Sequence, residues 1–221
     1  MDINQIVQTV AIYALPVLFA ITLHEAAHGY VARHFGDMTA YAQGRISLNP
    51  ARHIDPVGTI LVPIAILVLS MSTVGAGFLF GWAKPVPVNY SALRRPRQNM
   101  LWVAAAGPAA NLAMALGWTL LLRAVLFFPQ NDFSVPMRLM CEAGMQVNVV
   151  LMLLNLLPIL PLDGGRIVAS LLPVRMAWGY AKLEPWGFPI LLGLMFMGGL
   201  NVILAPMVAF SFSVLGTLFR I

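Results

Sequence analysis

Charged residues are scarce in this chain, where Asp, Glu, Lys and Arg together make up 10% of the 221 residues. Soluble domains carry about 25% charged residues. Hydrophobic residues reach 60%, and the mean hydropathy is +0.83. The composition therefore excludes an ordinary soluble protein and indicates an integral membrane protein that is in contact with the lipid bilayer. The net charge of +5 does not indicate nucleic acid as a partner, and it bears on orientation in the membrane instead.

Cysteine is nearly absent as well. Cys141 is the single cysteine, which excludes an internal disulfide and any metal site built from several cysteines. The chain has no internal repeat, no low-complexity tract and no room for a separate soluble domain, so we expect one integral-membrane domain over residues 1–221. Its first residues lack the positive charge of a cleaved signal peptide, and we expect the first apolar stretch to stay as a helix.

Apolar stretches of membrane-spanning length make up most of the chain. They cover residues 6–30, 57–80, 100–128, 139–158 and 187–219. A bilayer core about 30 Å thick needs about 20 residues of helix, so the last stretch is long enough to break in two at Gly198, Gly199 or Pro206. We therefore predict an all-α polytopic membrane protein with five to six transmembrane segments.

Lysine and arginine residues gather in three connections, at 33–56, 84–98 and 164–185. Because cytoplasmic loops carry an excess of these residues, we place the three connections in the cytoplasm and the N-terminus outside. The first two connections then lie on the same side, although an apolar stretch separates them. We therefore predict that residues 57–83 enter the membrane and return, as part of a re-entrant, partly β-like loop near 57–89. Non-helical backbone is tolerated at membrane depth where it lines a buried or wet cavity.

The most informative motif is His-Glu-Ala-Ala-His at residues 24–28, which follows the first apolar run. Ionisable side chains at membrane depth are costly and therefore indicate a function. On a helix, His24 and His28 share one face, so both imidazoles can bind one zinc ion. Glu25 lies one position further round the helix, near the water that such a metal activates. The motif predicts a metal-dependent hydrolase that works inside a membrane.

A catalytic zinc site needs a third protein ligand. His34 lies on another face of the helix, and His53 lies in a polar connection, so neither is favoured. Asp163 lies at the cytoplasmic end of the fourth apolar stretch, at the depth expected for His24 and His28. A common alternative role for this aspartate is to cap a helix that begins at Gly164. We expect ligation because the histidine pair is incomplete without it.

Three motifs in this order resemble the site-2 proteases, which are zinc-dependent intramembrane endopeptidases. The motifs are His24-Glu25-Ala-Ala-His28, Gly107-Pro108-Ala-Ala-Asn111 and Asn155-x-x-Pro158 with Leu162-Asp163-Gly164. The chain resembles the compact bacterial or archaeal form, without a PDZ domain or a nucleotide-binding module. The resemblance implies one zinc ion per chain with His24, His28 and Asp163 as ligands, and Glu25 as the general base.

The resemblance also implies where a substrate binds. It gives substrate-contacting roles to Asn155 and Asn111. In the family a membrane-embedded β-like loop holds the substrate as an added strand, and the region 74–89 matches that position, with residues 84–89 as the edge strand. We therefore expect Lys84, Val86 and Val88 to bind substrate through main-chain hydrogen bonds.

The expected function is zinc-dependent cleavage of a transmembrane or membrane-associated protein substrate, near the cytoplasmic face of a prokaryotic plasma membrane. The alternative is a membrane metal-ion transporter or channel that uses the same histidine and aspartate site, since such side chains also coordinate moving ions. Glu25 separates these two functions, because a transporter has no special need for a general base.

Overall fold

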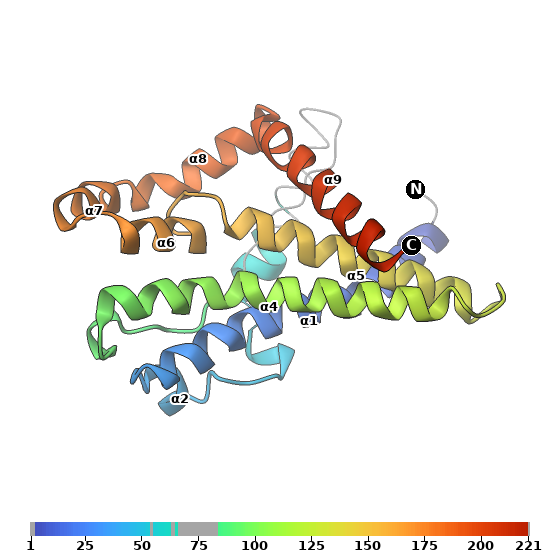
Figure 1. Ribbon diagram of the computed structural model, residues 1–221, viewed down its shortest axis with the longest axis horizontal. Helices are drawn as coiled ribbons and strands as arrows, with labels where there is room; N and C mark the ends of the chain where they lie inside the picture. The colour runs from blue at the N-terminus through green and yellow to red at the C-terminus, as the bar shows by residue number, and fades with distance from the viewer. Residues whose placement is uncertain (1–2, 54, 63–64, 66–83, 221) are drawn as a thin grey trace.

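The structure is a computed structural model that describes residues 3–53, 55–62, 65 and 84–220 (Figure 1). All its regular elements within these residues are helical, as predicted. The long helices are α1 (Ile3–His34), α4 (Pro96–Val125), α5 (Ser134–Asn155) and α9 (Gly199–Phe219). The shorter ones are α2 (Thr39–Ala42), η1 (Pro50–Arg52), η2 (Pro56–Leu61), η3 (Tyr90–Ala92), α6 (Asp163–Leu171), α7 (Val174–Ala181) and α8 (Glu184–Phe196).

Four helices of the described part are long and apolar enough to cross a membrane, and they lie in α1, α4, α5 and α9. The chain is therefore an integral membrane protein. Most of the predicted stretch 57–80, and with it most of the predicted re-entrant loop, lies outside the described residues. The count of five to six segments and the β-like loop thus stay predictions.

Helices α1, α4 and α5 pack together and form the centre of the molecule (Figure 1). The Arg94 N–H donates to the carbonyl of Phe35 at 3.0 Å, so the end of α1 lies beside the start of α4 and the two helices are antiparallel. A Cβ on Gly144 of α5 would lie 2.4 Å from the ring of Trp118 on α4. Small residues of this kind let membrane helices approach closely, where packing replaces the hydrophobic effect.

The last apolar stretch breaks in two, at one of the three predicted positions. Gly198 has a φ of +73°, which glycine tolerates and other residues avoid, and it separates α8 from α9. Helix α9 continues through Pro206. Helix α8 has 13 residues, or about 20 Å, which is too short to cross a bilayer core of about 30 Å alone.

The turn after α5 brings α6 back against α4. Gly164 and Gly165 at the start of α6 touch this turn closely, since Cβ atoms there would lie 2.2 Å from the Leu156 carbonyl oxygen and 2.6 Å from the Leu160 nitrogen. Glycine is therefore required for α6 to begin at this place. The residue directly before them, Asp163, is thereby directed toward the centre of the molecule.

Candidate metal centre

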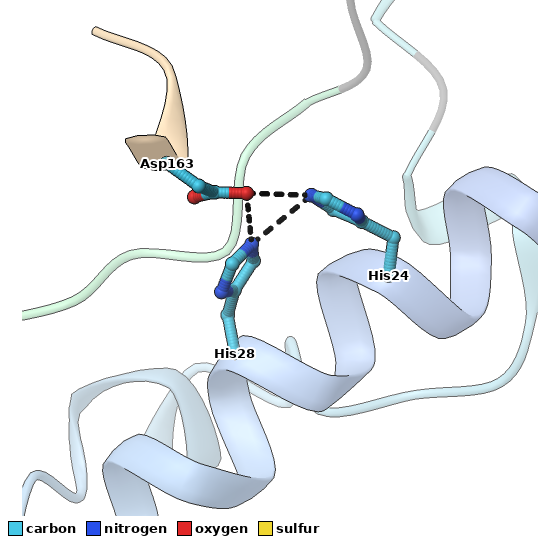
Figure 2. Close-up of side chains that lie close together, drawn as sticks. All are labelled: His24, His28 and Asp163. Atoms are coloured by element: carbon cyan, nitrogen blue, oxygen red, sulfur yellow. Dashed lines mark hydrogen bonds and ion pairs between the residues drawn. The ribbon is translucent and has the colours of Figure 1, made fainter. Parts of the chain in front are cut away.

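His24, His28 and Asp163 meet at one point between α1 and α6, with their side chains directed toward one another (Figure 2). The Nε2 atoms of the two histidines are 3.1 Å apart. Asp163 Oδ2 lies 3.2 Å from the first and 3.4 Å from the second. Each residue is less than a tenth exposed. The three side chains that the sequence predicted as ligands thus come together from segments far apart in the chain.

The hydrogen bonds on the far side of each imidazole fix where its proton lies. His24 Nδ1 is 2.5 Å from Asn111 Oδ1, and His28 Nδ1 is 2.7 Å from the carbonyl oxygen of Val103. An oxygen of this kind only accepts, so both Nδ1 atoms carry the proton. In its neutral form, each ring therefore presents an Nε2 lone pair toward the third member, Asp163.

The carboxylate of Asp163 adds a negative charge to this cluster. Oδ2 is buried and has no hydrogen-bond partner. A buried carboxylate oxygen without a donor is costly, and a cation among the three side chains would offset that cost.

Three electron-pair donors that converge without a proton between them repel one another unless a cation lies among them. Two nitrogens and one oxygen are ligand types that zinc prefers, and tetrahedral zinc bonds of 2.0–2.2 Å put ligand atoms about 3.3–3.6 Å apart. The observed separations of 3.1 to 3.4 Å are close to this range. The residues present thus fit a zinc ion with three protein ligands and one open position.

Gly107 of α4 lies directly against the imidazoles of the metal centre. A Cβ there would lie 2.5 Å from His24 Cε1 and 2.5 Å from His28 Nε2. Any larger side chain would occupy the space of both imidazoles. The glycine of the Gly-Pro-Ala-Ala-Asn motif is therefore required sterically at the metal centre.

Glu25 follows His24 on α1 and is partly buried. Its Oε2 accepts the N–H of Val86 at 2.8 Å. This bond joins the predicted general base to the segment predicted to bind substrate, residues 84–89, and it fixes one oxygen of the carboxylate.

Residues 84–89 are extended, and the rest of the protein binds their main chain at several points. Arg45 Nη2 donates to the carbonyls of Lys84 and Pro85 at 2.9 and 3.2 Å. Two further bonds of the segment run from Lys84 N to the His53 carbonyl and from Asn89 N to Asp37 Oδ2. Hydrogen bonds thus hold both ends of the segment in place.

The three predicted substrate-binding residues in this segment differ in exposure. Lys84 is exposed, Val86 is buried, and Val88 packs on a cluster that includes Ala32 and Leu93. The structure describes no strand that pairs with this segment, in the residues it covers. The substrate-binding roles stay predictions.

The two predicted asparagines lie in different surroundings. Asn111 is fully buried and contacts His24. Asn155, the last residue of α5, is partly buried and donates to the Leu151 carbonyl one turn earlier, at 3.0 Å. The structure thus brings Asn111 to a predicted metal ligand, while a contact of either residue with substrate stays a prediction.

The other two histidines lie away from the group of three. His34 is exposed and packs edge-on against Phe35, and His53 Nε2 lies 2.8 Å from the Ser47 carbonyl oxygen. Neither was favoured as a ligand from the sequence. One residue that sequence reasoning missed is Asn148, which is buried in α5 and contacts Asn111. Its polar side chain within an apolar run was the available signal.

Curated proteins similar to this chain carry the name of one enzyme class. The chain is 39% identical over 181 residues to "Putative zinc metalloprotease YwhC" of Bacillus subtilis, across 80% of this chain and 77% of that protein. It is 32% identical over 184 residues to "Putative zinc metalloprotease Rip2" of Mycolicibacterium smegmatis, across 83% of this chain and 66% of that protein. It is also 32% identical over 173 residues to Rip2 of Mycobacterium tuberculosis, where it spans about half of the relative, 54%. No protein-family model matches the chain, and no solved structure matches it.

Proposed function

This chain belongs to the site-2 protease family of zinc metalloproteases, and on that premise we propose that it is a zinc-dependent intramembrane endopeptidase. It hydrolyses peptide bonds in or near transmembrane segments of membrane proteins. The observation that carries the proposal is the convergence of His24 Nε2, His28 Nε2 and Asp163 Oδ2 within 3.4 Å of one another, beside Glu25. Full ligand and base sets argue for an active enzyme.

His24, His28 and Asp163 hold one zinc ion per chain in this proposal. When bound, zinc supplies a Lewis acid that polarises the scissile carbonyl and lowers the pKa of a coordinated water toward 7. These three side chains hold the metal near the end of a membrane helix, at a depth where a transmembrane substrate can reach it.

Glu25 acts as the general base and then as the general acid. Its carboxylate takes a proton from the attacking water and passes it to the leaving amine. Because Oε2 accepts the Val86 N–H, the proton goes to Oε1. The bond to Val86 keeps the carboxylate from rotating while it transfers the proton.

The substrate must unwind locally, because a helix hides its carbonyls in hydrogen bonds. We propose that the unwound stretch lies along residues 84–89, beside Lys84, Val86 and Val88, as an added strand. Pro85 and Pro87 carry no N–H, so this segment offers a substrate mainly carbonyl acceptors. An amide donor such as Asn155 would then supply a hydrogen bond to the developing oxyanion.

We place the enzyme in a prokaryotic plasma membrane, with the N-terminus outside and the metal centre toward the cytoplasm. Lysine and arginine residues support this orientation, because they gather in the connections on one side.

The test is purification with zinc analysis, together with cleavage of a model transmembrane substrate. We expect about one zinc per chain in the wild type and in Glu25→Gln, with cleavage by Glu25→Gln reduced at least about 100-fold. Asp163→Ala should lose both zinc and cleavage. Glu142→Gln is the matched control, since Glu142 forms an ion pair with Arg138 on α5, and it should keep both.

Zinc flux in proteoliposomes separates the proposal from a metal transporter. A protease should show no flux above empty liposomes. Flux that persists in Glu25→Gln, without cleavage by the wild type, would establish the transporter instead.

A further inference from the structure

Two asparagines lie deep in the bundle and take no part in the chemistry proposed above. Asn111 on α4 and Asn148 on α5 are each 0% exposed. A buried amide without partners costs several kcal/mol, and the cost is not lower among membrane helices. Each of these buried amides therefore needs hydrogen-bond partners.

A carbonyl of α5 fixes the orientation of the Asn148 amide. The side chain of Asn148 reaches the carbonyl oxygen of Gly144 at 2.8 Å. A carbonyl only accepts, so the NH₂ group of Asn148 faces Gly144, and its Oδ1 faces Asn111 at 3.0 Å. The group of Asn111 that meets this oxygen must donate, and it is therefore the NH₂ group.

A carbonyl of α1 gives the same orientation independently. The Nδ2 of Asn111 lies 3.4 Å from the carbonyl oxygen of Ala20, which again requires a donor there. Asn111 Oδ1 is then directed at His24 Nδ1, 2.5 Å away. Since this oxygen only accepts, His24 Nδ1 carries a proton, and the neutral ring keeps its lone pair on Nε2, where a metal can bind.

The ring of His28 needs no second residue to hold its acceptor in place, whereas the ring of His24 does, because the two acceptors differ. His28 Nδ1 faces the backbone carbonyl of Val103, which cannot exchange an acceptor for a donor. An asparagine amide can rotate by half a turn and present NH₂ in place of oxygen. Asn148 opposes that rotation of Asn111, because its own Oδ1 would then face another oxygen.

We propose that Asn111 and Asn148 are positioning residues that act in series: Asn148 fixes the amide orientation of Asn111, and Asn111 fixes the tautomer and ring orientation of His24 for metal binding. This inference rests on the zinc site proposed above. Outer hydrogen bonds of this kind commonly change metal affinity by about 10- to 100-fold.

The first test measures zinc affinity by competition with a chelator in the purified, detergent-solubilised protein. Asn111→Leu should weaken zinc binding about 10- to 100-fold, and Asn148→Leu by about tenfold or less. The double variant should bind zinc no more weakly than Asn111→Leu, because Asn148 acts through Asn111. A double variant that shows the product of the two single losses would overturn the serial arrangement.

Thr119→Val is the matched control. Thr119 is also 0% exposed on α4, and its hydroxyl donates within the helix to the Ala115 carbonyl. The Thr119→Val substitution removes one buried polar group without touching a histidine, so zinc affinity should stay at the wild-type value. A loss equal to that in Asn148→Leu would mean that any buried polar group matters, and it would refute a specific role.

The second test needs no variant to fold. Nitrogen NMR of ¹⁵N-histidine-labelled, zinc-free wild type should show a proton on His24 Nδ1, where Asn111 Oδ1 accepts it. The reverse tautomer would overturn the inference whatever the fate of the proposed function. If the wild type binds zinc and cleaves substrate while both asparagine variants bind zinc equally well, the inference alone is wrong. If the wild type binds no zinc, the proposed function fails.

Discussion

At the scale of single residues, Gly107 leaves no space for a side chain beside the metal centre. The imidazoles of His24 and His28 lie 2.5 Å from the place of an added Cβ. We predict that Gly107→Ala displaces one imidazole, lowers zinc affinity at least about tenfold, as the loss of a well-oriented ligand does, and reduces cleavage with it. Zinc content after dialysis against a chelator measures the effect.

Gly117 supplies the control on the same helix. Apart from its chain neighbours and the backbone of its own helix, no atom lies within 4 Å of an added Cβ there, so Gly117→Ala should leave zinc content and cleavage unchanged. Equal losses in both variants would mean that the damage comes from the flexibility of α4 and not from the imidazoles.

Sequence reasoning reached some of these residues and not others, for a physical reason. The spacing of His24 and His28 follows from helix geometry, and Asp163 could be matched to them by depth. The contacts of Gly107 and Asn148 depend on how α1, α4 and α5 are rotated against one another. No local pattern specifies that rotation, so these two residues could not receive their roles from the sequence.

At the scale of elements, Asp37 joins three segments near the C-terminal end of α1. It is fully buried, and its carboxylate accepts the N–H of Thr39, at the start of α2, and of Asn89, after the extended segment. Burial alone would raise the pKa of Asp37, but the bonds from Thr39 and Asn89 outweigh it and lower that pKa. The charged carboxylate thus stabilises the arrangement of α1, α2 and residues 84–89.

We predict that Asp37→Asn destabilises the protein by about 1–3 kcal/mol, because an amide can accept at one side only and leaves the other N–H unpaired. The folded-state pKa is the lower one, so the stabilisation is present above the unfolded pKa of about 3.9 and is lost as pH falls below it. Thermal unfolding in detergent should show a constant gap between variant and wild type near neutral pH, which narrows below about pH 4.

Asp132→Asn is the control, since Asp132 is exposed in the connection between α4 and α5. It should unfold like the wild type. A gap for Asp37→Asn that does not depend on pH would contradict the role of the charge.

The extended segment and Glu25, the proposed general base, are linked by the N–H of Val86. We predict that Val86→Pro, which removes this donor, lowers kcat about tenfold or more while zinc content stays unchanged, since a hydrogen bond to a charged group contributes about 1.5–3 kcal/mol. Val86→Ala keeps the N–H and should keep kcat. Steady-state cleavage kinetics measures both, and equal losses would assign the effect to the side chain.

The bounds of these elements were predicted to within a few residues where apolar runs are long. The stretches expected at 100–128 and 139–158 correspond to α4 and α5, which begin and end a few residues earlier. Hydropathy marks where a helix meets lipid, whereas backbone hydrogen bonds continue into polar residues such as Arg97. The role of Asp37 was not predicted, because its bond with Asn89 joins segments 52 residues apart.

At the scale of the whole molecule, the described helices separate the positive charges between two ends. Arg123, Arg138 and Arg220 lie at the end formed by the connection between α4 and α5 and by the end of α9, where Arg123 Nη1 donates to the Arg220 carbonyl at 3.3 Å. The other ten of the 13 lysines and arginines (13 − 3) lie at the C-terminal end of α1, at the N-terminal end of α4, or in the segments that follow α1 and α5. This asymmetry predicts one orientation of the bundle in the membrane, and it favours a single crossing by α8 and α9 together.

We predict that the connection after α4 and the end of α9 face the outside, while α7 faces the cytoplasm. In a Cys141→Ser background, which removes the single native cysteine, a membrane-impermeant maleimide applied to intact cells should label Gln130→Cys and Arg220→Cys. It should label Arg175→Cys only after the cells are opened. All three positions are exposed, so a missing label reports the side of the membrane and not burial. Labelling of Arg175→Cys alone in intact cells would invert the orientation, whereas an unlabelled Arg220→Cys beside a labelled Gln130→Cys would mean that α8 and α9 return to the side from which they enter.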